Sequence, residues 1–164
     1  MEKTSKSKPK QKSKKTKKAP PKVSYHYKPD NLTLEQWQIA LRQQAAQKEN
    51  FAISEMNAKE YPGYYRVANP VSHNEYRVVF RGHESPWNYC SCMDFKTSQL
   101  GTCKHLEAVK LWIAEKRKKI HREQPSYTSV YLSYRKERKV CLRIGTDNAE
   151  EFRQLAQPYF GSAE

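Results

Sequence analysis

The sequence predicts an α+β domain preceded by a basic tail, and three observations lead to this fold class. Short segments in the middle of the chain alternate apolar and polar residues, which is typical of antiparallel strands. Apolar residues recur at helical spacing on both sides of those segments. Three of the four cysteines fall within residues 90–103, and a histidine follows at position 105. The cluster lies where the predicted strands give way to a predicted helix.

The chain begins with a strongly basic segment. Residues 1–22 contain ten lysines and one glutamate, a formal charge of +9, so the remaining chain carries +5 of the net charge of +14. This low-complexity segment has no apolar residue that could anchor it, and we expect a disordered Lys-rich tail and linker over residues 1–28. Such a tail attracts phosphate backbones, although a tail that only aids solubility is the alternative. The candidate contacts are Lys14, Lys15, Lys17 and Lys18.

Residues 29–60 predict a helix followed by a short strand. Thr33 has the position of an N-cap, and Gln36 three residues later completes a capping box. Residues 51–56 then alternate like a strand. The apolar stripe of the helix comprises Leu34, Trp37, Leu41 and Ala45, and core packing of this stripe is the expectation.

Residues 61–122 predict a metal-binding module built on a meander. Alternating segments at 64–69, 75–81 and 87–92 are separated by turn residues, which indicates three antiparallel strands. The third strand delivers the first two cysteines, and the segment at 93–102 is expected to be a loop. The predicted inward side chains are Val67, Val78 and Phe80.

Cys90, Cys92, Cys103 and His105 supply a complete set of four metal ligands. Thiolate sulfur and neutral imidazole suit Zn²⁺, which binds four ligands tetrahedrally. Side chains two apart at the end of a strand point to the same side, and the second pair can converge where a helix begins. Four protein ligands favour a closed structural site, because a catalytic zinc keeps one position open. His73 and His83 are expected at the surface, since the set is already full.

The cysteine cluster has two alternative interpretations. A disulfide is disfavoured because the chain has no secretory signal and its lysine-rich start is typical of intracellular proteins, where thiols stay reduced. Cysteines are often ordinary core residues, which is our interpretation of Cys141, but clustering with a histidine argues against that for the remaining three. The sequence also has no run of about 18 apolar residues, so we expect a soluble, cytoplasmic protein without a membrane segment.

The spacing Cys-x-Cys-x10-Cys-x-His, with Asp94-Phe95 after the second cysteine and Gly101 before the third, resembles a SWIM zinc finger. The sequence around it, over residues 64–113, resembles the N-terminal region of bacterial Swi/Snf-type DEAD/DEAH-box helicases. The resemblance implies a Zn²⁺ cofactor and two kinds of partner. One is nucleic acid, with DNA as the expected type, and the other is a protein such as the helicase core.

Basic residues around the cluster are the candidate nucleic-acid contacts. Some flank the second cysteine pair, and the rest gather at the end of the helix predicted over residues 103–120. Cations also suit a helix C-terminus by themselves, which remains the alternative for the second group. The candidates are Lys96, Lys104, Lys116, Arg117, Lys118 and Lys119.

Residues 126–161 predict a small ββα unit. Strand periodicity at 127–134 and 139–145 is followed by a helix with Phe152 and Leu155 expected inward. Its position at the end of the chain favours a truncated domain of a longer protein.

The sequence contains no Gly-x4-Gly-Lys-Ser/Thr phosphate loop, no acidic ATPase box and no paired catalytic groups near the metal ligands. We therefore expect no enzyme activity within these residues. The prediction is a zinc-binding accessory module that binds nucleic acid, and the alternative is a zinc-stapled protein–protein interaction module.

Overall fold

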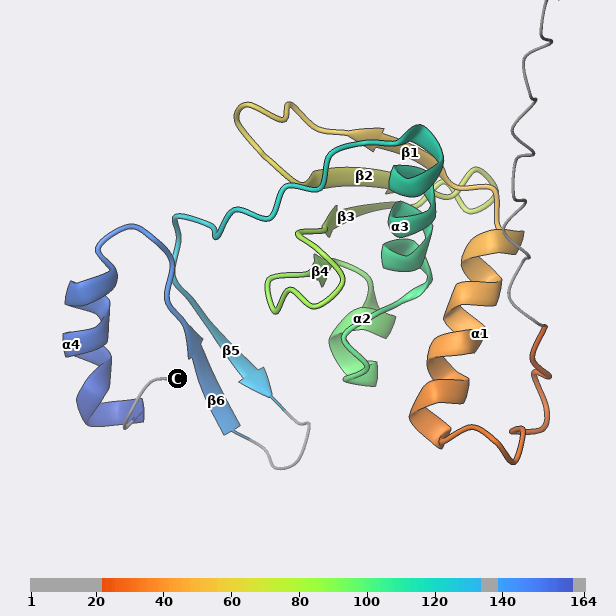
Figure 1. The fold of residues 1–164 in the computed structure, drawn as a ribbon, viewed down its shortest axis with the longest axis horizontal. Helices are drawn as coiled ribbons and strands as arrows, with labels where there is room; N and C mark the ends of the chain where they lie inside the picture. Colours follow the sequence, from red (N-terminus) through yellow and green to blue (C-terminus); the bar gives the residue numbers. More distant parts are fainter. Residues whose placement is uncertain (1–21, 134–138, 161–164) are drawn as a thin grey trace, which may run out of the picture.

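The computed structural model describes residues 22–133 and 139–160, and these residues form four helices and six strands (Figure 1). The predicted tail, with Lys14, Lys15, Lys17 and Lys18, lies outside the described residues. The elements are α1 Leu34–Lys48, β1 Ala52–Glu55, β2 Tyr64–Ala68, β3 Glu75–Val79, β4 Tyr89–Cys90, α2 Met93–Ser98, α3 Lys104–Lys116, β5 Ser129–Ser133, β6 Lys139–Arg143 and α4 Ala149–Phe160.

The main sheet is antiparallel, with its strands in the order β1-β2-β3-β4. It corrects the prediction of a three-stranded meander, because β1 adds a fourth strand at the edge. Ile53 of β1 lies opposite Val67 of β2 and packs against the core, and this apolar contact holds the short strand in register. The mixed α+β class is confirmed.

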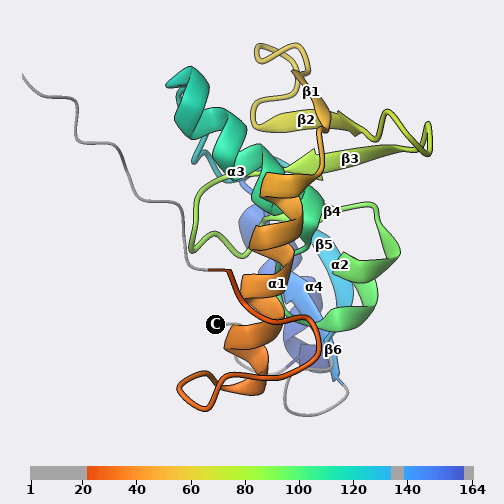
Figure 2. The same cartoon turned by 90° about the vertical axis from the view of Figure 1, so that its right-hand side faces the viewer.

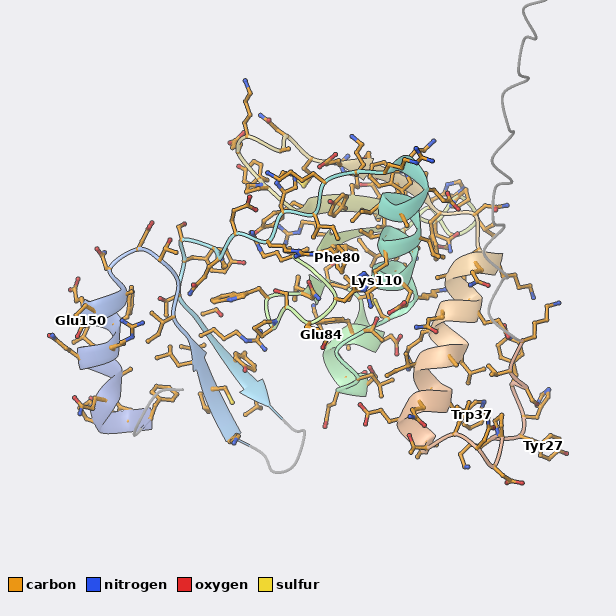
Figure 3. All side chains as sticks on the ribbon, viewed as in Figure 1. Tyr27, Trp37, Phe80, Glu84, Lys110 and Glu150 are labelled. Carbon is orange, nitrogen blue, oxygen red and sulfur yellow. The ribbon has the colours of Figure 1, made fainter. Side chains whose placement is uncertain are left out.

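The sheet, α3 and α1 form successive layers. Figures 1 and 2 show α3 lying between the sheet and α1. The inward predictions are confirmed, because Val67, Val78 and Phe80 are fully buried in the core cluster that includes residues of α3. Phe80 is labelled in Figure 3. The helix contributes the other half of this core through Leu106, Val109 and Ile113.

The start of α1 has the predicted capping box. The side chain of Thr33 accepts from the amide of Gln36, whose side chain accepts from the amide of Thr33. This reciprocal pair satisfies two amides at the N-terminus of the helix that have no partner within the helix itself.

The apolar stripe of α1 packs less fully than predicted. Leu34 in the first turn is exposed, and Trp37 is half-buried and stands outside the core cluster. The indole Nε1 of Trp37 donates to the carbonyl of Ser24 at 2.8 Å, so the ring packs on the N-terminal segment that carries Tyr27 (Figure 3). The first turns of α1 therefore anchor that segment rather than the sheet.

Two helix boundaries differ from the prediction. The segment expected as a loop contains the short helix α2, because Cys92 leaves the strand and caps it. Helix α3 ends at Lys116 rather than near residue 120, since Arg117 adopts the left-handed conformation (φ 51°) and the amide of Lys118 bonds back to the carbonyl of Ile113 at 3.0 Å. Each helix in the described part of the chain is too short or too polar to cross a lipid bilayer.

The C-terminal elements do not form the packed ββα unit predicted. Strands β5 and β6 pair as an antiparallel hairpin, as expected. Helix α4 follows them, but the residues predicted to face inward are exposed, at 38% for Phe152 and 62% for Leu155. The helix itself was predicted correctly, but Ala156 rather than Phe152 or Leu155 is its buried residue.

The phenol of Tyr65 leads to a stability prediction. Its ring is fully buried, and its hydroxyl has no hydrogen-bond partner among the described residues. Burial, with a smaller contribution from Glu55, raises the pKa of Tyr65 to about 12. Tyr65→Phe should therefore increase the free energy of unfolding by about 1 kcal/mol at neutral pH, because it removes an unsatisfied buried hydroxyl.

The same substitution should alter the alkaline limb of the stability curve. The unfolded phenol ionises near pH 10 and the folded one near pH 12, so the contribution of Tyr65 is intact below about pH 10 and is lost as pH rises toward 12. Tyr65→Phe should lose less stability over that range. Urea unfolding at about pH 8 and pH 11 measures both effects, and a variant less stable than wild type at pH 8 would contradict the assignment.

Candidate metal centre

Four buried side chains meet where β4, α2 and α3 come together. The ligand atoms of Cys90, Cys92, Cys103 and His105 all lie within 4.8 Å of one another, and none of the four residues is more than 5% exposed. The structure thus brings together all four residues that the sequence selected. This arrangement can hold a metal ion.

Each cysteine is positioned by a specific feature of the backbone. Cys90 ends β4 opposite Val78. Cys92 caps α2, and its sulfur accepts from the amide of Phe95 at 3.4 Å. Cys103 caps α3, and its sulfur accepts from the amide of Leu106 at 3.5 Å. Two of the three sulfurs therefore face helix amides, which favour the thiolate over the thiol.

The ring of His105 is fixed by its aromatic neighbours. It stacks on Tyr76 with a centroid distance of 4.0 Å and meets the edge of Phe51 at 5.1 Å. Its Nδ1 lies 3.9 Å from the sulfur of Cys90, and its buried Nε2 has no hydrogen-bond partner among the described residues. A ring nitrogen left without a protein partner is available to a metal ion.

The electrostatics of the sulfurs also favour a cation. Hydrogen bonds from the thiols of Cys103 and then Cys90 lower the pKa of Cys92. The pKa of Cys103 is raised, because its thiol interacts with the sulfurs of Cys90 and Cys92 and because it is buried. Three thiolates at this separation require a cation to offset their repulsion.

The donor set fits a tetrahedral ion. Zn–S bonds of about 2.3 Å at tetrahedral angles place the sulfurs about 3.8 Å apart, so atoms within 4.8 Å need only a small approach to bind. Four protein ligands leave no position for water or substrate, which suits a structural role. Cys141 belongs elsewhere, since it is half-buried on β6 and contacts the carbonyl of Lys139.

Helix α1 reaches the centre through an ion pair that the sequence did not reveal. The guanidinium of Arg42 donates to both oxygens of Asp94, at 2.6 and 3.0 Å. Asp94 comes shortly after Cys92 in the sequence, but its partner is on a helix 52 positions earlier. Nothing local in the sequence signals such a pair. Tyr76 could have been found, because period-two alternation places it on the face of Val78.

The candidate nucleic-acid contacts near the centre differ in availability. Lys96 on α2 is exposed, and its ammonium group has no hydrogen-bond or ion-pair partner within the described residues. Lys104 is engaged, since its ammonium lies 2.7 and 2.8 Å from the two carboxylate oxygens of Glu49 and 5.6 Å from the centroid of Phe51. It holds the end of α1 against the start of α3.

The basic residues at the other end of α3 lie about 18 Å away along the helix. Lys118 pairs with Glu55 at 3.0 Å, and Lys119 approaches Glu123 at 3.9 Å. Lys116 and Arg117 are exposed and have no carboxylate partner in the described part of the chain. The structure therefore separates the candidates into two groups rather than one patch.

Comparison with known proteins finds no match: no family model, no curated protein and no solved structure is similar to the chain. The site is therefore defined by its own geometry, which is that of a buried Cys3His centre in a mixed α+β fold.

Removing one ligand should destabilise the domain. Cys103→Ala deletes a ligand and the cap of α3, and the binding energy of a structural metal is folding energy. We expect the midpoint of thermal unfolding of the zinc-loaded protein to fall by at least about 10 °C. Circular dichroism of zinc-loaded and chelated protein measures this.

The matched control is Cys141→Ala, which removes the one cysteine outside the centre and should leave the midpoint nearly unchanged. Excess chelator should reduce the midpoint of the wild-type and Cys141→Ala proteins, but have little further effect on Cys103→Ala. Native stability of Cys103→Ala would contradict a structural role for the centre.

Proposed function

We propose that the chain is a zinc-binding accessory module that binds nucleic acid, with DNA as the expected type. The observation that carries the zinc half of the proposal is the buried set of four ligand atoms within 4.8 Å. Three sulfurs and one imidazole select zinc over magnesium or calcium, which prefer oxygen ligands. The spacing of the four residues also resembles that of a SWIM zinc finger.

The charge of the chain supports the nucleic-acid half. The net charge of +14 gives an attraction for phosphate that needs no base contacts. Among the candidate contacts within the described residues, Lys96, Lys116 and Arg117 are free to act, whereas Lys104 and Lys118 are held by glutamates. The lysines of residues 1–22 would add salt-sensitive affinity to whatever the folded part contributes.

The resemblance to the N-terminal region of Swi/Snf-type helicases supports an accessory role. In that role zinc would stabilise the fold, because the four protein ligands would fill its coordination positions. We propose that the module has no catalytic activity of its own.

A second candidate function is protein docking, and one observation favours it. The C-terminal hairpin and α4 expose large apolar side chains that a separate partner would cover. These are Val130, Leu132, Val140, Leu155 and Tyr159.

Salt dependence discriminates between the two functions. Binding of a fluorescent DNA duplex and of the matching single strand is measured for the zinc-loaded chain over a salt series. The matched variant replaces the ten lysines of residues 1–22 with glutamine. If the folded part binds phosphates, log K of the variant should still fall with log salt, with a slope of about −2 or steeper. Each neutralised phosphate contributes about −0.7 to −0.9 to that slope.

The variant should also lose that binding when zinc is chelated, because the folded surface depends on the centre. If replacing the tail lysines abolishes binding, the folded module makes no contact and the docking function is favoured. Binding that is insensitive to both changes would contradict the proposed role of zinc.

A further inference from the structure

The outer face of the main sheet, opposite α3, has a composition unlike that of the core face. The register places Arg66 of β2, Arg77 of β3 and Tyr89 of β4 on this side, together with Tyr64 and Val79. Arg66 and Arg77 are exposed at its centre, and Tyr89 is 40% exposed beside them. We call Arg66, Arg77 and Tyr89 the outer-face set.

The two arginines lie directly opposite each other in the β2–β3 pairing. Like charges at such a position are destabilising, because the side chains lie about 5 Å apart at their Cβ atoms. The guanidinium of Arg66 has one long contact, at 3.6 Å, with the carboxylate of Glu75. The side chains of Arg66 and Glu75 are each more than half exposed. The guanidinium of Arg77 has no partner in the described part of the chain. Glu75 on the same face offsets part of this charge, so the pair of arginines presents one positive charge in excess, which a phosphate would relieve.

Tyr89 lies next to Arg77 on this face. Val79 lies opposite Tyr89, so Arg77 is the diagonal neighbour of Tyr89 across the β3–β4 pairing. Ser91 fixes the two strands, because its amide donates to the carbonyl of Arg77 and its hydroxyl accepts from the amide of Arg77, both at 3.0 Å. The ring of Tyr89 makes a T-shaped contact with Phe95 of α2, with the ring centroids 5.9 Å apart, and 40% of the residue stays exposed.

We propose that the outer-face set binds single-stranded nucleic acid, with Arg66 and Arg77 on the phosphates and the ring of Tyr89 stacked on a base. The face is covered at Val79, which is buried, and at Tyr64, whose hydroxyl donates to that of Tyr127, but it is exposed at the two arginines and Tyr89. An exposed ring beside two guanidinium groups is the chemistry of a stacking platform. A base reaches such a ring only when it is unpaired, so a duplex fits this face poorly. Lys96 is a further exposed cation on α2, the helix whose Phe95 contacts Tyr89. This inference rests on the proposed function and assigns its contact surface.

The test uses the full chain loaded with zinc and a labelled DNA strand of about twelve nucleotides, within the site sizes of single-strand binders. The variant R66Q/R77Q should bind about tenfold more weakly at about 100 mM salt, and its salt slope should be shallower by about 1.4, because two phosphate contacts are lost. The control variant K28Q/R153Q removes two exposed cations, Lys28 on the N-terminal segment and Arg153 on α4. Arg153 has an exposed ion pair with Glu150, as Arg66 has with Glu75, so the control matches the outer-face variant in this respect. It should bind within about twofold of wild type, since the ten lysines of residues 1–22 are the same in all variants.

Substitution of the tyrosine separates stacking from charge. Tyr89→Ala should weaken binding about tenfold without changing the salt slope, whereas Tyr89→Phe should retain it, because the ring rather than the hydroxyl makes the contact. Circular dichroism and zinc content confirm that each variant is folded. The outer-face variants should change duplex binding by less than about twofold.

The outcomes distinguish this inference from the proposed function. If wild-type protein binds no nucleic acid, the proposed function fails and the inference fails with it. If wild type binds but R66Q/R77Q matches K28Q/R153Q, or Tyr89→Ala matches Tyr89→Phe, the outer face is not the contact and only the inference is overturned. A larger loss for the duplex than for the single strand also overturns it.

Discussion

The structure depends on the convergence of three sulfurs and one imidazole inside the core. Cys90, Cys92 and Cys103 belong to the same buried cluster as Leu106 and Val109, so the centre is part of the core. Buried thiolates are costly without a counter-charge, and buried thiols fill space without holding strands and helices together. A bound dication would resolve both problems, because it would pair the charges and link β4, α2 and α3 at one point.

The helices around the centre are tied to it by ion pairs. Arg42 joins α1 to α2 through Asp94, and Glu49 at the end of α1 holds Lys104 at the start of α3. These side chains are partly shielded from solvent, so the pairs contribute more to positioning than fully exposed pairs would. Through these ion pairs α1 contacts α2 and the start of α3, the two helices capped by Cys92 and Cys103. Loss of the metal would therefore loosen contacts well beyond the four ligands.

The surface of the domain is divided by chemistry. The outer face of the sheet presents arginines and a tyrosine, whereas the C-terminal hairpin and α4 present apolar side chains. Figure 1 shows the hairpin and α4 on the side of the sheet away from α1. The two proposed functions, nucleic-acid binding and protein docking, therefore rest on different elements of the chain.

The sequence by itself determined the four candidate ligands, the inward side of β2 and β3, the capping box of α1 and the order of the elements other than α2. These features are local, since they depend on spacing, period and turn chemistry over a few residues. Only the tertiary structure decided that β1 joins the sheet, that Lys104 and Lys118 are held by glutamates, and that α4 leaves its apolar side chains exposed. The physical reason is separation along the chain: Glu49 lies 55 positions from Lys104, and no local pattern encodes which distant side chain will meet it. The exposed pair of Arg66 and Arg77 was likewise decided by strand register, which the sequence alone did not specify.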